Sequence, residues 1–168
     1  YLGAVDGGTS ATNDPFMATY GFQIDLNTSF TGEDSLDISL DAGNSTTTTT
    51  GVAEFDGNAT TDKLTVDGVS YTFPVGDATV FVGDNTDGSA LFSTACVYGG
   101  PSNTLDDCGN VSAAFVGGGT SAGASIDFEN GFTAAVGYAG AGSSTSGLLT
   151  EEGLDSYGAN VAYTGDNY

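Results

Sequence analysis

The side chains able to do chemistry in this chain are almost all carboxylates. Its 168 residues hold 22 Asp and Glu, one Lys, no Arg and no His, which gives a formal net charge of −21. Catalytic Ser-His-Asp or Cys-His sets and His-rich zinc sites therefore cannot be built, and a Schiff base could form only at Lys63. Two carboxylates can cleave glycosides, but no spacing selects one pair among so many. We expect no enzyme activity, no metal site and no cofactor.

The lack of basic residues also excludes classes of partner. A protein that binds nucleic acid neutralises phosphates with clustered Lys and Arg, and this chain has one base. Polybasic binding to an anionic membrane surface is excluded for the same reason. Only 14% of the residues are charged, so the acidity comes from missing bases more than from surplus acids. Nucleic acid is not an expected partner.

Two cysteines, Cys96 and Cys108, flank a stretch rich in turn-forming residues. We expect them to form a disulfide in a long loop. In the chain-entropy model, closing a loop of this length stabilises the fold by about 3 kcal/mol, and such a bond indicates an oxidising compartment. The alternative is a pair of free thiols in a cytosolic loop. Two thiolates without any His do not complete a zinc site.

The elements that must position the carboxylates are β-strands. The run 20–30 alternates strictly, with apolar and aromatic side chains on one face and polar ones on the other. The run 36–42 alternates in the same way. The polar positions of these two runs are Gln23, Asp25, Asn27, Asp37, Ser39 and Asp41.

Alternation continues to the end of the chain, so eight or nine strands are expected. Further runs cover 64–66, 69–75, 78–82, 111–115, 124–128, 132–138 and 157–163. Asp67-Gly68 and Asn130-Gly131 predict two-residue hairpin turns. Pro74 should lie at a strand end or edge, because proline cannot donate to a ladder.

Two all-β classes fit this pattern. In a soluble sandwich the apolar face points into a core, whereas in an outer-membrane barrel it points outward to lipid and the polar face lines the interior. Strands of about ten residues and aromatic residues at strand ends favour the barrel. Acids on the strands fit a watery interior, and they fit the solvated face of a soluble sheet equally well. No apolar run approaches the roughly 20 residues that a transmembrane helix needs.

The stretch 20–44, with Asn-Thr-Ser-Phe-Thr-Gly-Glu-Asp between two strands and Ala-Gly-Asn at its end, resembles the hallmark of cyanobacterial outer-membrane porins. Asp62-Lys63-Leu64 and the stretch 69–83 are similar to later elements of that family, in the same order. The resemblance covers about half of the chain. It implies an antiparallel up-and-down transmembrane β-barrel of about sixteen strands in the outer membrane of a cyanobacterial cell. It also implies contact with outer-membrane lipid, a homotrimer, and passive diffusion of small hydrophilic solutes, carbohydrates and ions.

We expect residues 1–168 to be only a portion of such a barrel. Sixteen strands of about ten residues need about 160 residues before any loop is counted. The family's surface-layer-homology domain and coiled segment do not occur in the sequence. The last in-phase strand ends at Tyr163, and 165–167 looks like a following turn. The alternative is a complete eight-stranded barrel in which 157–163 pairs with the first strand.

The resemblance also suggests which side chains would matter. In a barrel, the six polar positions of the first two long strands face the lumen, and their three aspartates favour cations. Family members often carry Lys or Arg after Thr-Gly, where this chain has Glu33, Asp37 and Ser39, so an anion preference is not carried over. The second hypothesis is a secreted acidic β-sheet protein of a surface layer or an adhesin, without a pore.

Overall fold

A computed structural model describes residues 2–4, 16–44, 58, 60–93, 119–128, 130–140 and 154–165. Every regular element in these ranges is a β-strand. Within the same ranges, no helix has the length and apolar character needed to cross a membrane. The all-β class expected from the alternation is therefore confirmed for the described residues.

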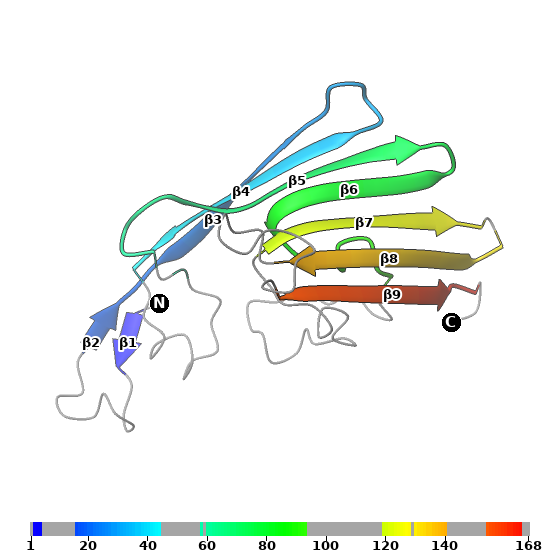
Figure 1. The fold of residues 1–168 in the computed structure, drawn as a ribbon. Coiled ribbons are helices and arrows are strands. Elements are labelled where there is room, and N and C mark those ends of the chain that lie inside the picture. The colour runs from blue at the N-terminus through cyan, green and yellow to red at the C-terminus, as the bar shows by residue number, and fades with distance from the viewer. Residues whose placement is uncertain are drawn as a thin grey trace. The chain divides into compact units, whose positions relative to one another are not determined.

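The strands follow one another along the chain as labelled in Figure 1. Two are short, and the others have eight to eleven residues. They are β1 (Leu2–Ala4), β2 (Phe16–Ala18), β3 (Gly21–Thr28), β4 (Ser35–Gly43), β5 (Thr65–Val75), β6 (Ala78–Thr86), β7 (Gly119–Asp127), β8 (Phe132–Gly140) and β9 (Asp155–Tyr163).

Each strand pairs with its neighbour in sequence. β1 and β2 form an antiparallel pair, and the other seven form one open sheet in the order β3-β4-β5-β6-β7-β8-β9. The registers from β5 to β9 are antiparallel throughout. This is an up-and-down order with β3 and β9 as its edges. The predicted strand over 111–115 lies outside the described residues.

Close backbone contacts divide the chain into two compact units. The first holds residues 1–25, 39–67 and 97–108, and the second holds residues 26–38, 68–96 and 109–168. The second unit contains the paired parts of β5 and β6 and all of β7, β8 and β9.

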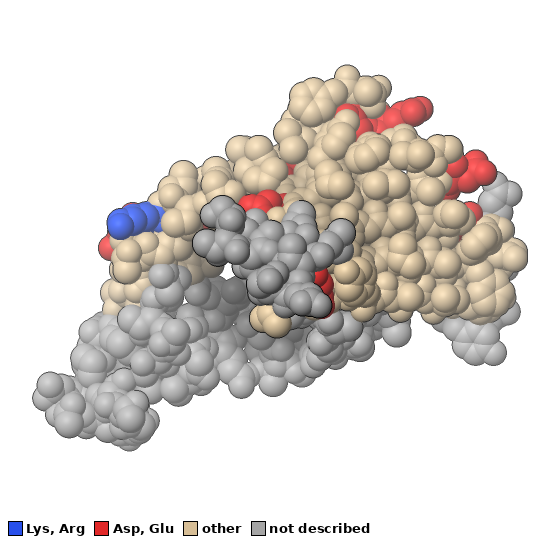
Figure 2. Space-filling view, viewed as in Figure 1, with Lys and Arg blue, Asp and Glu red and all other residues tan. Residues whose placement is uncertain are grey.

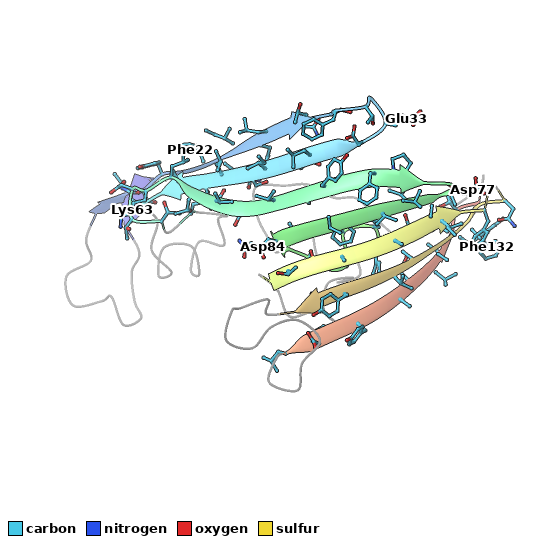
Figure 3. All side chains as sticks on the ribbon, turned by 45° about the horizontal axis from the view of Figure 1, so that its top comes forward. Phe22, Glu33, Lys63, Asp77, Asp84 and Phe132 are labelled. Atoms are coloured by element: carbon cyan, nitrogen blue, oxygen red, sulfur yellow. The ribbon has the colours of Figure 1, made fainter. Side chains whose placement is uncertain are left out.

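Short and long connections alternate along the sheet. The turns 29–34, 76–77 and 128–131 are short, whereas 44–64, 87–118 and 141–154 are long. Because neighbouring strands run antiparallel, all three short turns fall at one end of the strands. Figure 3 shows Glu33, Asp77 and Phe132 at this end and Asp84 at the opposite end of β6. We call these ends the short-turn end and the long-loop end.

The predicted hairpin at Asp67-Gly68 is wrong, because β5 runs without a break from Thr65 to Val75. Gly68 is buried, and a Cβ at this position would lie 3.0 Å from the backbone oxygen of Asn85. The glycine therefore permits a close backbone approach inside a strand. The turn lies instead at Gly76-Asp77, where Gly76 has a φ of +62°.

Two other local predictions are confirmed, the first of them in part. The hairpin predicted at Asn130-Gly131 does join β7 and β8, with a φ of +86° at Gly131, but residues 128–131 connect the two strands, so the turn is longer than the two residues expected. The N–H of Phe128 donates to the carbonyl of Phe132 at 3.0 Å and closes this turn. Pro74 is the second-last residue of β5, so it lies at a strand end as expected.

Candidate functional site

The paired registers of β6 to β9 assign every side chain of these strands to one of two faces. Residues directly opposite each other in antiparallel strands share a face. The face that collects the apolar side chains consists mainly of Ala78, Val80, Val82, Ala122, Ala124, Ile126, Ala134, Val136, Tyr138, Tyr157, Ala159 and Val161. We call it the apolar face.

The opposite face carries hydroxyls, one amide, and many glycines and alanines. Its central members are Thr79, Phe81, Gly83, Ser121, Gly123, Ser125, Thr133, Ala135, Gly137, Ala139, Gly158, Asn160 and Ala162. We call it the polar face. Figure 2 shows the sheet from the side of the apolar face, and the surface over β6 to β9 has no charged residue in its middle.

Burial on the two faces is the reverse of that in a soluble sheet. On the apolar face Val136 is 57%, Tyr157 66% and Val161 72% exposed. On the polar face Phe81 and Ser121 are each 1% exposed, and Ala139 is fully buried. Apart from Phe81, the large apolar side chains are thus open, while the small and polar ones are covered.

Phe81 is the one large side chain of the polar face. It is paired with Gly123 on β7, and a Cβ at Gly123 would lie 2.5 Å from its ring. The aromatic ring therefore occupies space that only a glycine leaves free. Phe81 lies out of phase with Val80 and Val82, so the alternation gave no reason to expect a buried side chain here.

Aromatic rings gather at both ends of the apolar face. Phe132 and Tyr163 lie at the short-turn end with ring centroids 4.7 Å apart. Tyr138 and Tyr157 lie toward the long-loop end, 5.4 Å apart. Between them the face is aliphatic, with valine, isoleucine and alanine side chains.

The first unit brings together three of the six polar residues singled out from the sequence. Asp25 Oδ1 accepts hydrogen bonds from Gln23 Nε2 at 2.6 Å and from Ser39 Oγ at 2.8 Å. These bonds place the three side chains on the same face of β3 and β4. Asp41 lies further along β4, where its backbone carbonyl accepts a bond from Thr65 Oγ1 at 3.3 Å.

The second unit brings together two more of these residues. Asn27 Nδ2 donates to Asp37 Oδ1 at 2.5 Å and to Ser35 Oγ at 2.6 Å. Ser35 Oγ in turn donates to Asp37 Oδ2 at 2.7 Å. Ser35 was not singled out from the sequence. Each of Asp25 and Asp37 is therefore held by amide and hydroxyl donors, and neither bond set contains a base.

The most densely hydrogen-bonded carboxylate in the described turns is Asp34, which the sequence analysis did not select. Its Oδ1 accepts from Ser29 Oγ at 2.6 Å, from the N–H and Oγ of Thr31 at 2.8 Å each, and from the N–H of Phe30 at 3.0 Å. Its Oδ2 accepts from the Tyr71 hydroxyl at 2.5 Å.

These bonds hold the Ser-Phe-Thr-Gly-Glu-Asp stretch, residues 29–34, in a single turn. The hydrogen bond from Ser29, followed by those from Tyr71 and Thr31, holds the pKa of the Asp34 carboxyl far below its ordinary value. Gly32 adopts a φ of +89° and donates its N–H to Ser29 Oγ at 2.8 Å. The abundance of Ser, Thr, Gly and Asp was the available signal, since these residues bond to nearby backbone groups.

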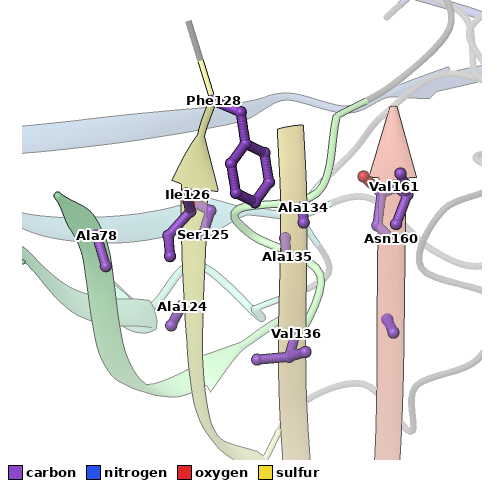
Figure 4. Close-up of a pocket in the computed structure, with 11 residues that line it drawn as sticks. Ala78, Ala124, Ser125, Ile126, Phe128, Ala134, Ala135, Val136, Asn160 and Val161 are labelled. Atoms are coloured by element: carbon purple, nitrogen blue, oxygen red, sulfur yellow. The ribbon is translucent and has the colours of Figure 1, made fainter. Parts of the chain in front are cut away.

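The apolar face also carries a shallow depression of about 320 Å³, shown in Figure 4. Alanines such as Ala124 and Ala134 form its floor, and Ile126, Phe128 and Val161 stand around it. Ser125 and Asn160 are the polar residues of its lining, and the rest of the lining is apolar, so the depression lacks the several convergent polar groups that orient a substrate. Among the described residues, no three His, Cys, Asp or Glu side chains lie close enough together to hold a metal ion.

Cys96 and Cys108 lie outside the described residues, so their pairing stays a prediction. No protein-family model, curated protein or solved structure matches this chain.

Proposed function

We propose that this chain is part of an outer-membrane β-barrel that forms an aqueous channel for passive diffusion of small hydrophilic solutes and ions. The observation that carries the proposal is the reversed burial of β6 to β9. Water disfavours a continuous apolar surface of valine, isoleucine and tyrosine, and exposed apolar patches of this kind mark membrane or protein contacts. A barrel turns such a face to lipid and keeps its polar face inside.

The lengths of the strands and connections support the same proposal. Nine residues rising about 3.3 Å each span about 30 Å, and a tilt near 40° reduces this to about 23 Å, close to the apolar band of about 25 Å in outer-membrane barrels. Such barrels have short turns at one end, longer loops at the other, and aromatic girdles at both. The alternating connections and the two aromatic pairs fit this plan.

The open edges of the sheet indicate that further strands complete the proposed barrel. In lipid, unpaired N–H and C=O groups are costly, so a membrane-spanning sheet must close on itself. Strands beyond β3 and β9 would supply this closure. The resemblance to cyanobacterial porins adds about sixteen strands, a cyanobacterial outer membrane and a trimer to the proposal.

A preference for cations follows from the acids of β3 and β4. In the proposed barrel Gln23, Asp25, Asn27, Asp37, Ser39 and Asp41 face the lumen. Carboxylates along a low-dielectric wall raise the local concentration of cations. The bond sets around Asp25 and Asp37 contain only amides and hydroxyls, so no base within them cancels these charges.

Planar-bilayer recording on the purified full-length protein tests the proposal. We expect stepwise conductance increments and, in a salt gradient, a reversal potential on the cation side. A protein that stays monodisperse in buffer without detergent and adds no conductance would contradict the channel. That result would favour the secreted acidic β-sheet protein.

A further inference from the structure

The chain that follows β6 is ordered and compact. Ala90 N–H donates to the carbonyl of Asp87 at 3.1 Å, and Phe92 N–H donates to the carbonyl of Ser89 at 2.7 Å. Asp87 Oδ1 accepts from both the N–H and the hydroxyl of Ser89 at 2.9 Å. We call residues 87–93 the crossing segment, for the path described next.

The end of the crossing segment is bonded to β8 and β9 on the polar face. Ser93 N–H donates to Asn160 Oδ1 at 3.0 Å, and Asn160 Nδ2 donates to the Ser93 carbonyl at 3.3 Å. The hydroxyls of Ser93 and Thr133 lie 2.9 Å apart. One side-chain amide therefore bonds both backbone groups of Ser93, as a neighbouring strand would.

These partners define the path of the segment. Thr86 pairs with Gly119 at the long-loop end, whereas Asn160 lies inside β9 and Thr133 is the second residue of β8, near the short-turn end. The segment thus passes beneath β7 and β8 instead of leaving the sheet. Figure 1 shows it as the green ribbon that leaves β6 and runs behind β7 and β8.

We propose that Asn160 is a positioning residue that clasps the crossing segment against the polar face, where this segment narrows the channel. The narrowing rests on the proposed function, because the polar face is a channel wall only in a barrel. Among the polar-face positions of β9, Asn160 alone carries an amide, since the others are Ser156, Gly158 and Ala162. Only an amide offers both a donor and an acceptor in the geometry that a backbone peptide unit requires.

The first test is the substitution Asn160→Ala in the full-length protein. Removing both bonds to Ser93 should release the segment, so the single-channel conductance in planar bilayers should rise. Ser125→Ala, a matched change on the polar face of β7, should leave the conductance unchanged. Thr133→Val removes one hydroxyl partner and should give a smaller rise than Asn160→Ala.

A second readout does not depend on conduction. Leu91 and Phe92 are half-buried, and chymotrypsin cleaves after both residue types when the segment opens. Loss of two hydrogen bonds should raise the rate of cleavage at these sites roughly tenfold, because cleavage follows the population of the open form. Peptide mapping by mass spectrometry separates these cuts from others.

The two readouts separate a failure of the proposed channel function from a failure of the proposed role of Asn160. If the unchanged protein does not conduct, the proposed function fails, while the cleavage rate still shows whether Asn160 holds the segment. If Asn160→Ala alters neither conductance nor cleavage, Asn160 does not hold the crossing segment against the polar face. If cleavage rises and conductance stays the same, the segment is clasped without narrowing a channel, and the proposal is overturned.

Discussion

The two faces of β6 to β9 differ in whether their side chains are exposed or buried. On the apolar face Val136 and Val161 are open, whereas on the polar face Ser121, Ala139 and Phe81 are covered. A soluble sheet covers its valines first, because their burial is its main source of stability. Alternation alone therefore does not separate a soluble sandwich from a barrel. The distinguishing observation is which face has the exposed side chains and which has the buried ones.

The largest expected effect is on the covered face. Phe81→Ala should lower the free energy of unfolding by about 3–5 kcal/mol, the usual cost of deleting a buried phenylalanine side chain. Val82→Ala, one residue further on the open face, should cost far less. Denaturant titration of both variants in detergent measures the difference. Equal losses would show that the two faces are not packed differently.

A charged side chain on the apolar face should lower the stability of the protein if this face contacts lipid. Val136→Arg, in the middle of β8, should cost about 2–4 kcal/mol in a bilayer, the range for Arg at the midplane of a barrel. An exposed position on a soluble sheet tolerates such a change within about 0.5 kcal/mol. Ser125→Arg on the polar face of β7 is the matched control and should cost less. A loss below that of the control would contradict contact between Val136 and lipid.

The acids of the first two long strands should matter for selectivity and little for stability. Replacing Asp25, Asp37 and Asp41 by Asn should move the reversal potential in a salt gradient toward zero, because the wall loses its negative charge. Folding should survive, since an Asn side chain keeps one acceptor oxygen for the Ser39 and Gln23 donors. An unchanged potential would show that these residues do not set selectivity.

The turn around Asp34 belongs to neither face and should respond to pH. Its lowered carboxyl pKa means that the unfolded chain binds a proton near pH 4 while the folded one does not. The stability from Asp34 is therefore complete above about pH 5 and is lost as the pH falls below about 4. Asp34→Asn should lower stability at neutral pH and flatten the acid limb of the unfolding midpoint against pH. Parallel acid limbs in the two proteins would refute this role.

Alternation predicted most of the strands, because the two faces of a strand are set by residues that are close together in the sequence. The exposures of β9 alternate from Tyr157 to Tyr163 in the phase that the sequence gives to its apolar residues. The predicted runs 69–75 and 78–82 leave Gly76-Asp77 between them, but Asp67-Gly68 was taken as the hairpin because Asp-Gly is a strong turn signal, whereas Gly can also come first in a two-residue turn. Gly68 is a glycine because the backbone of Asn85 approaches it closely. Asn85 lies seventeen positions further along the chain, so a local sequence pattern does not reveal this contact.

The candidate site was less predictable than the strands, since it depends on partners that are distant in sequence. Asp34 is bonded by Tyr71 from β5, and Ser93 by Asn160 from β9. Alternation assigns residues to faces, but it does not show that a later segment returns across one of them. The grouping of Gln23, Asp25 and Ser39 was predictable, because neighbouring strands place them on one face.

Direct contact between the apolar face and lipid is the central claim, and single indoles added to residues 1–168, which contain no tryptophan, test it. Val136→Trp and Ser125→Trp each introduce a single indole at a similar depth on opposite faces of paired strands. In bilayers whose acyl chains carry bromine, we expect strong quenching of the Val136→Trp fluorescence and little quenching for Ser125→Trp. Equal quenching of the two proteins, or quenching of Ser125→Trp alone, would contradict an apolar face that meets lipid.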